Sequence, residues 1–303
     1  MHRDEVRVSV DQVRALLADQ APQWADCTVT AVPGAGTVNA IFRIGDGLAA
    51  RFPLRRADHE QAASRLAAER AAMAEFGVAS PFPAPEVLLV GQPGHGYAAA
   101  WSVQTWIEGT APTPTSLQDS DSFAGDLADL ISALRQCDTG GRTFDGSNRG
   151  GELRSHDAWM QDCIARSEGL ADTAAMRRLW NRYRDLPRAD PDAMSHTDLI
   201  PGNLLVVDGR LVGVIDTGDF RAADPALDLV AAWHLLDESR RAVLRSRLRC
   251  DDLQWERGKA WAFEQAAGLV WYYRESNPPM AHLGETTLRR LIDADSAIRT
   301  RPG

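Results

Sequence analysis

The sequence predicts an α+β fold with two lobes, a small N-terminal lobe built on an antiparallel sheet and a larger, mainly helical C-terminal lobe. Two observations carry this prediction. The first 107 residues alternate short apolar runs with turns rich in Gly and Pro, whereas most later segments have the apolar spacing of helices. At 303 residues the chain is also longer than one average domain. We therefore expect the lobes to cover residues 1–107 and 108–303.

A helix should open the N-terminal lobe. Ser9 and Gln12 have the spacing of a capping box ahead of an amphipathic segment that ends near Asp19. Glycines and prolines then divide the chain into short elements. We expect them in the order strand, strand, strand, helix, strand and strand, over 27–32, 38–44, 48–53, 57–76, 86–91 and 97–107.

The C-terminal lobe should begin after a linker at 108–114, which contains Gly109 and two prolines. We expect helices over 120–137, 157–168, 172–185, 224–237, 238–249, 253–275 and 285–298. A loop with five glycines is expected over 138–151. One β-hairpin interrupts the helices, because two apolar runs at 203–207 and 210–215 flank an Asp-Gly turn.

Composition excludes several classes of protein. The chain has 33 basic and 42 acidic residues, a net charge of −9, which argues against a protein that binds the phosphate backbone of nucleic acids. No apolar stretch is long enough to span a membrane, and no apolar segment of a signal peptide is apparent. The four cysteines are scattered without metal-ligand spacing, as in a reducing compartment. We therefore expect a cytoplasmic protein.

Polar residues gather at the open end of the expected hairpin. Asn203 and Asp216 stand at its two ends, so their oxygen atoms should face the same volume and suit a hard cation such as Mg²⁺. Asp198, five residues before Asn203, could accept or orient the proton of a hydroxyl group. Both spacings match the catalytic segments of protein kinases, H-R-D-x-x-x-x-N followed by D-F-G.

Three motifs carry a family resemblance. The sequence H-T-D-L-I-P-G-N from His196, then V-I-D-T-G-D, then A-D-P-A-L-D-L resembles the aminoglycoside phosphotransferase family of antibiotic and metabolite kinases, over roughly 28–275. The resemblance implies a protein-kinase-like fold, with Asp198 as the catalytic base and Asn203 and Asp216 as Mg²⁺ ligands. It also implies that Asp228 braces the catalytic loop through backbone amides and that His196 is structural. Thr197 stands where the family usually has Gly.

The same resemblance implies that the N-terminal lobe binds ATP or GTP, between which the sequence does not decide. Gly34 and Gly36 would lie in the loop that covers the phosphates. Arg51 occupies the position of the lysine that usually holds the phosphates, and the only lysine of the chain is Lys259. Arg keeps the positive charge and can hold two phosphate oxygens with its planar fork, although the substitution also leaves open a weakened or inactive kinase.

The acidic partner of Arg51 should be Glu69, with Glu60 as the second candidate and a surface ion pair one helical turn away as the alternative. The strand that joins the lobes would hold the purine through its main chain, and Gln104, Thr105 and Trp106 bracket that contact. For Trp106, packing in the core is an equal alternative.

The acceptor should bind between the catalytic loop and the C-terminal helices, as in the family. Glu264, Gly268, Trp271 and Glu275 share one face of the expected helix and could receive a cationic, hydroxylated ligand. The alternative for this stripe is helix packing with solvated ends. Asp157 and Trp159 are weaker candidates of the same kind.

These features predict transfer of a γ-phosphoryl group to a hydroxyl of a small molecule. The leading expectation is an antibiotic acceptor, of aminoglycoside, macrolide or cyclic-peptide type, and hence resistance. The alternatives are a kinase of a sugar, amino alcohol or other metabolite, and a non-catalytic nucleotide- or drug-binding relative. A protein kinase is disfavoured, because no A-P-E segment follows Asp216 before the next expected helix.

Overall fold

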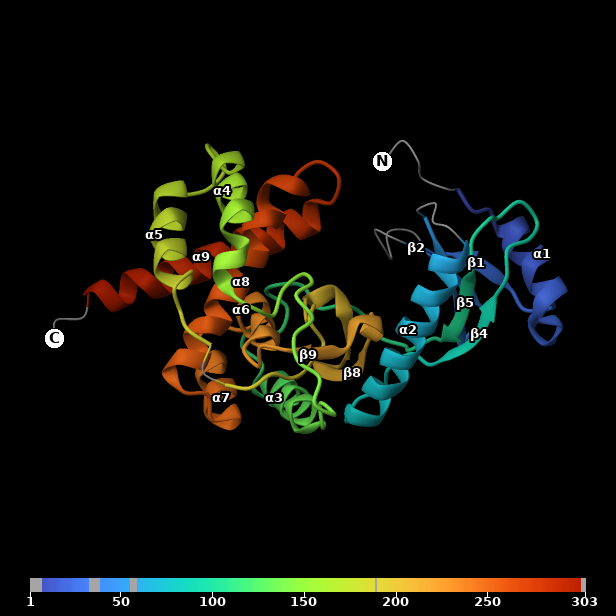
Figure 1. The fold of residues 1–303 in the computed structure, drawn as a ribbon, viewed down its shortest axis with the longest axis horizontal. Helices are drawn as coiled ribbons and strands as arrows, with labels where there is room; N and C mark the ends of the chain where they lie inside the picture. The colour runs from blue at the N-terminus through green and yellow to red at the C-terminus, as the bar shows by residue number, and fades with distance from the viewer. Residues whose placement is uncertain (1–6, 33–38, 55–58, 189, 301–303) are drawn as a thin grey trace. The chain divides into compact units, whose positions relative to one another are not determined.

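The computed structural model describes residues 7–32, 39–54, 59–188 and 190–300. The chain forms two compact units (Figure 1). The first comprises Met1–Val78, Pro83–Glu108 and Gly213–Asp219, and the second comprises Ala79–Phe82, Gly109–Val212 and Phe220–Gly303. One unit contains an antiparallel sheet and the other is mainly helical, so the predicted α+β fold is confirmed.

The first unit is built on a five-stranded antiparallel sheet with the order β1-β2-β3-β5-β4. Its strands are β1 (Val29–Ala31), β2 (Asn39–Ile44), β3 (Leu48–Pro53), β4 (Val87–Gly91) and β5 (Trp101–Thr105). The central strand β3 pairs with β2 on one side and β5 on the other, which fixes Arg51 opposite Ile41 and Ser102.

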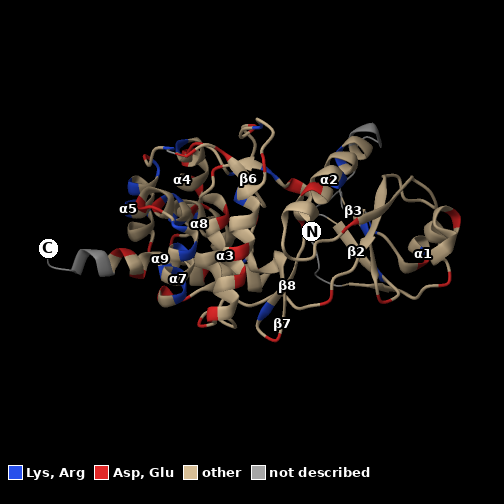
Figure 2. Ribbon diagram, turned by 90° about the horizontal axis from the view of Figure 1, so that it is seen from below, with Lys and Arg blue, Asp and Glu red and all other residues tan. Residues whose placement is uncertain are grey.

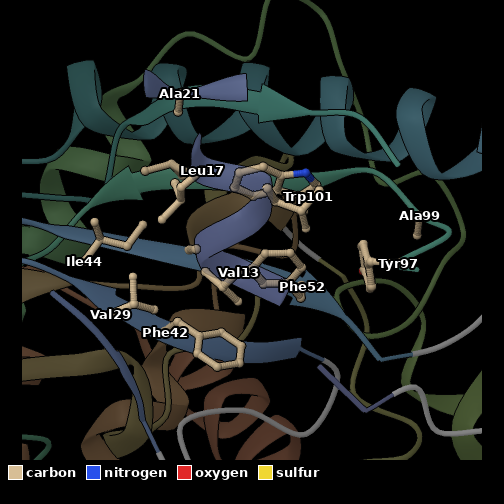
Figure 3. Packing of buried hydrophobic residues seen from close by; sticks show 13 residues of the cluster. Val13, Leu17, Ala21, Val29, Phe42, Ile44, Phe52, Tyr97, Ala99 and Trp101 are labelled. Atoms are coloured by element: carbon tan, nitrogen blue, oxygen red, sulfur yellow. The ribbon is translucent and has the colours of Figure 1, made fainter. Parts of the chain in front are cut away.

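Helix α1 (Val10–Gln20) covers one face of this sheet, and α2 (His59–Ala79) lies on the opposite side in Figure 1. The expected capping box is present, because Ser9 Oγ accepts from the amide of Gln12 at 3.2 Å and Gln12 Oε1 accepts from the amide of Ser9 at 3.0 Å. Figure 3 shows α1 packed over Phe52 and Trp101, whose rings stack at a centroid distance of 5.1 Å. Gly91 is required beside this stack, since a Cβ there would lie 2.1 Å from the indole.

The second unit is organised around α8 (Asp252–Tyr272), which is buried from Arg257 to Val270 and packs against α4, α5, α6 and α9 (Figure 1). Its other helices are α3 (Asp121–Gln136), α4 (Asp157–Arg166), α5 (Thr173–Tyr183), α6 (Val230–Leu235), α7 (Glu238–Leu248) and α9 (Pro278–Thr300).

Three helix predictions need correction. The segment 224–237 forms a 3₁₀ turn, Leu227–Leu229, before the short helix α6. Helix α8 ends at Tyr272 rather than at 275, and α9 begins at Pro278 rather than at 285. The early start of α9 is compatible with its two prolines, because the first helical turn needs no intrahelical N–H donors.

Two small sheets flank the segment expected to be catalytic. The predicted hairpin is confirmed as β7 (Leu204–Val207) and β8 (Arg210–Val214), and Asp208 and Gly209 in its turn have φ of 49° and 75°. A second pair, β6 (Ala193–Ser195) and β9 (Arg221–Ala223), was not predicted. None of the described helices combines the length and hydropathy needed to cross a membrane.

Candidate active site

The loop expected to be catalytic connects β6 to β7 in the second unit, and a buried carboxylate fixes its start. Asp228 accepts hydrogen bonds from Ser195 Oγ at 2.9 Å, the amide of His196 at 3.0 Å and the amide of Thr197 at 3.2 Å. Three donors compensate a carboxylate that is only 3% exposed. Asp228 therefore braces the loop through backbone amides, in the way the resemblance implied.

Thr197 has a φ of 72°, in the left-handed region that glycine adopts most easily. A β-branched residue there is strained by about 1–2 kcal/mol. This explains physically why Gly suits the position. The hydrogen bond that the Thr197 amide donates to Asp228 helps to hold Thr197 in its strained conformation.

Asp198 follows directly and is held from three sides. Its Oδ1 accepts from Gln265 Nε2 at 2.6 Å and from Arg149 Nη2 at 2.9 Å. Its Oδ2 lies 3.3 Å from Asn203 Nδ2, and its carbonyl oxygen accepts from the same nitrogen at 2.8 Å. The side chain remains 38% exposed. Oδ1 is thus committed to two protein donors, while Oδ2 keeps capacity for a further hydrogen bond.

Asn203 is buried with a fixed amide orientation. Because Nδ2 donates to Asp198, Oδ1 is the opposite end of the amide and can serve as an oxygen ligand. His196 is 1% exposed, and its Nδ1 accepts from the amide of Asp198 at 3.4 Å. That contact within the loop agrees with the structural role expected for His196.

A buried chain of hydrogen bonds continues behind Gln265. Since Gln265 donates to Asp198 through Nε2, its Oε1 must accept from His234 Nε2, 2.9 Å away. His234 Nδ1 then accepts from Thr287 Oγ1 at 2.8 Å. Burial lowers the pKa of His234 to about 4, so the imidazole is neutral and has the required tautomer.

Sequence reasoning missed Arg149 and Gln265. Arg149 lies in the glycine-rich loop 138–151 and resembles any other arginine of an arginine-rich chain. Gln265 follows Glu264 but lies outside the face chosen on α8. Both reach Asp198 through contacts between residues distant in the sequence, for which the sequence carries no signal.

The first unit holds the other expected residues. Arg51 Nη2 lies 3.3 Å from Asp216 Oδ1, and the Arg51 side chain is 16% exposed whereas that of Asp216 is 55% exposed. Asp216 has a φ of 60°. Glu69 pairs with Arg65 at 2.9 Å, one helical turn away, and packs on Gly218, where a Cβ would lie 3.2 Å from Glu69 Cγ. Glu69 therefore forms the ion pair along its own helix that was the alternative to a pair with Arg51, and Arg51 pairs with Asp216.

In the segment expected beside the purine, the main-chain amides of Thr105 and Trp106 already donate hydrogen bonds within the first unit. The amide of Thr105 donates to Glu86 at 3.0 Å, and that of Trp106 donates to Gly47 at 2.8 Å. Within the described part of the chain, Gln104 Oε1 and Trp106 Nε1 are buried without a hydrogen-bond partner. Gly34 and Gly36 lie outside the described residues, as does the side chain of Glu60.

The acceptor candidates on α8 have different surroundings: Glu264 contacts charged side chains, whereas Gly268 and Trp271 lie beside Trp159. Glu264 is buried, 3.0 Å from His156 Nδ1 and 3.7 Å from Arg149 Nη1. Gly268 is overlaid by Trp159, because a Cβ there would lie 2.8 Å from that indole, and Trp159 lies 6.1 Å from the ring of Trp271.

Glu275 and Asp157 behave differently from these residues. Glu275 lies beyond the end of α8 and is exposed, so the expected four-residue helical face is wrong at this position. Asp157 pairs with Arg184 and accepts from Trp180 Nε1 at 2.9 Å. Burial opposes its ionisation, but the hydrogen bonds from Arg184 and Trp180 outweigh burial and lower the pKa of Asp157.

Comparison with known proteins identifies the family. The model of the phosphotransferase enzyme family, APH, matches residues 29–262. The chain belongs to the phosphotransferase enzyme family. Among its relatives, an aminoglycoside 3'-phosphotransferase from Escherichia coli is 41% identical over 56 residues, which are 18% of this chain and 21% of that protein.

Solved structures of the family share the fold. The GDP complex of wild-type aminoglycoside 2'-phosphotransferase-IIIa is 17% identical with a TM-score of 0.69, covering 96% of this chain and 100% of the other. A macrolide 2'-phosphotransferase type I is 21% identical with a TM-score of 0.63, covering 94% and 98%. This phosphotransferase therefore has the kinase-like fold that its motifs implied.

Proposed function

We propose that this phosphotransferase is a Mg²⁺-dependent enzyme that transfers the γ-phosphoryl group of ATP or GTP to a hydroxyl of an antibiotic. The observation that carries the proposal is the geometry of Asp198. Gln265 and Arg149 fix Oδ1 of this partly exposed side chain, so Oδ2 can accept a hydrogen bond from an acceptor hydroxyl. A positioned carboxylate of this kind is what general-base catalysis requires.

In the proposed reaction, the acceptor oxygen attacks the γ-phosphorus while its proton passes to Oδ2 of Asp198. One O–P bond forms, and the bond from the γ-phosphorus to the bridging oxygen breaks. The electron pair remains on the nucleoside diphosphate, and Asp198 later releases the proton to solvent. Catalysis in this class comes mainly from positioning and from neutralising charge.

Mg²⁺ prefers a few hard oxygen ligands in addition to phosphate oxygens. The amide oxygen of Asn203 and the exposed carboxylate of Asp216 have this chemistry, and we propose both as its ligands. When bound, Mg²⁺ would neutralise charge on the phosphates. Among the described residues, no three His, Cys, Asp or Glu side chains form a metal-binding cluster.

Arg51 is proposed to hold phosphate oxygens of the nucleotide. Its guanidinium already lies beside Asp216, where a phosphate–metal complex needs positive charge. The other proposed nucleotide contacts are Glu69, Gly34, Gly36, Gln104, Thr105 and Trp106. Of these, Glu69 lies against Gly218, two residues after Asp216.

An antibiotic acceptor is supported by the names of the relatives, which include aminoglycoside and macrolide phosphotransferases. On the acceptor side, we propose Glu264 and Trp271 as contacts, because both lie on α8, the helix whose Gln265 contacts Asp198. Asp157 is not proposed as an acceptor contact, since its carboxylate already accepts hydrogen bonds from Arg184 and Trp180. We also propose a cytoplasmic location, where nucleoside triphosphates are available and the four cysteine thiols would stay reduced.

The decisive experiment measures ADP and GDP release with Mg²⁺ against pooled hydroxylated antibiotics and metabolites. We expect release that depends on one pool, and a loss of at least about 100-fold in Asp198→Ala with nucleotide affinity preserved. Asp129→Ala, which removes an exposed carboxylate on α3, is the matched control and should retain activity. Turnover retained by Asp198→Ala would remove the base from its role, and release with metabolites alone would identify a metabolite kinase.

A further inference from the structure

Arg149 compensates two carboxylates at the proposed acceptor side of the second unit. Its Nη2 lies 2.9 Å from Asp198 Oδ1, and its Nη1 lies 3.7 Å from Glu264 Oε2. Glu264 is 3% exposed, and its Oε2 makes no hydrogen bond to any described residue. Two carboxylates and one guanidinium leave one formal negative charge and one unsatisfied acceptor, before any contribution from His156.

The loop places Arg149 through specific packing. Gly150 has a φ of 114°, and a Cβ there would lie 2.7 Å from Ala223 Cβ. Its carbonyl accepts from the amide of Asp224 at 2.9 Å. The next carbonyl, of Gly151, accepts from Arg257 at 3.0 Å, and Arg257 in turn forms a buried ion pair with Asp224. The guanidinium of Arg149 is therefore a fixed part of the site.

The neighbouring helices provide no excess of negative charge. Residues 153–184, which include α4 and α5, contain six arginines and four Asp or Glu. Two of these carboxylates pair with arginines, Asp157 with Arg184 and Asp162 with Arg166. Figure 2 shows basic and acidic positions intermixed over α4 and α5 rather than a continuous acidic face.

We propose that Arg149 makes the site selective for a hydroxylated acceptor that is neutral or carries one cationic group, and that it excludes polycationic acceptors. This inference rests on the proposed function and narrows its acceptor class. A molecule with several ammonium groups needs several uncompensated carboxylates, whereas this site offers one net negative charge and holds a guanidinium against it. An acceptor with a single amine can meet the unsatisfied oxygen of Glu264 while its hydroxyl meets Asp198.

Calorimetry on the full chain tests the role of Arg149 with two probes, kanamycin as a polyamine and erythromycin as a molecule with one tertiary amine. We expect Arg149→Gln to raise kanamycin affinity at least tenfold, because the carboxylates of Asp198 and Glu264 then lose their compensating charge. Arg149→Lys keeps the charge and should stay close to the wild type. Arg154→Gln is the matched control, since Arg154 pairs with Asp185 at 2.6 Å and touches neither carboxylate.

Kanamycin affinity that is unchanged in Arg149→Gln, or that rises equally in Arg154→Gln, would overturn the proposal. A second measurement needs no variant: wild-type transfer should favour erythromycin over kanamycin by at least 100-fold in kcat/KM, and a preference for kanamycin contradicts it. The two failures are distinguishable. If the wild type phosphorylates kanamycin and Asp198→Ala does not, the proposed function stands and the selectivity fails. If Arg149→Gln changes kanamycin affinity but no acceptor is phosphorylated, the charge effect of Arg149 stands and the proposed function fails.

Discussion

The two aspartates of the proposed chemistry are held in opposite ways. Asp198 receives hydrogen bonds from Arg149, Gln265 and Asn203, and its loop is tied to a buried carboxylate. Asp216 lies in the other unit, has a left-handed backbone, is 55% exposed and contacts Arg51 at 3.3 Å. The protein itself thus orients the proposed base, whereas the proposed metal ligand keeps most of its oxygen surface for a partner from solution.

The largest expected effect breaks this contrast at Asp216. Asp216→Asn should lower kcat by about 10²–10³-fold, because the substitution removes the negative charge of the one anionic ligand proposed for Mg²⁺. Mg²⁺-dependent nucleotide affinity, measured by calorimetry, should fall in the same variant and remain unchanged in Asp198→Ala. Equal losses of affinity in both variants would mean that the two aspartates do not divide the work in this way.

A second effect tests how the base is held. Asp228→Ala removes an acceptor that serves three donors, so those buried groups become unsatisfied and the free energy of unfolding should fall by about 3 kcal/mol. Urea denaturation measures this loss. Asp129→Ala should stay within about 0.5 kcal/mol of the wild type, and a similarly small change in Asp228→Ala would show that the loop is held by other contacts.

The buried chain behind Asp198 predicts a dependence of stability on pH. Burial, with smaller effects from Arg290 and Arg149, lowers the pKa of His234 from 6.5 to about 4. Between these two pKa values the unfolded chain binds a proton at His234 that the folded chain does not bind. The contribution of His234 to the free energy of unfolding is therefore present above pH 6.5 and is lost as the pH falls towards 4. We expect a loss of about 2 kcal/mol between pH 7.5 and 5 from this residue.

Urea denaturation at several pH values checks this slope, with His234→Gln as the comparison. The variant lacks the titrating group and should lose that part of the slope between pH 7.5 and 5. An identical slope in both proteins would assign the pH dependence to other groups.

A smaller effect concerns Arg51, the neighbour of the exposed Asp216. Arg51→Ala should weaken nucleotide binding about tenfold, since one charge-assisted contact to phosphate is lost. Arg51→Lys keeps a positive charge but lacks the planar fork, so its nucleotide affinity should lie between that of the wild type and that of Arg51→Ala. Fluorescence competition with a labelled nucleotide measures both variants; unchanged affinity in Arg51→Ala would dissociate Arg51 from the phosphates.

The smallest effect concerns Thr197. Replacing it by Gly relieves about 1–2 kcal/mol of backbone strain but increases the entropy of the unfolded chain and removes a buried side chain. We expect these changes to nearly cancel, with a shift in unfolding free energy of less than about 1 kcal/mol. Thermal melts check this, and a loss of several kcal/mol would show that the Thr197 side chain stabilises the loop.

Much of the fold was readable from the sequence, because local rules determine it. The capping box at Ser9 and the Asp-Gly hairpin at Asp208 depend on neighbouring residues and were confirmed. The brace at Asp228 followed from a motif with fixed spacing. The site residues Arg149 and Gln265 did not, because their contacts with Asp198 span 49 and 67 positions in the chain. The short strands β6 and β9 were missed for the same reason, since neither forms without the other.

Helix α8 assigns separate tasks to neighbouring positions. Gln265 donates to the carboxylate of the proposed base, while Gly268 and Trp271 lie against the indole of Trp159. Substitutions at 268 and 271 can therefore reshape the surface beside the site without changing the donor to Asp198. We therefore expect changes at these two positions to alter the proposed acceptor surface while Gln265 still holds Asp198.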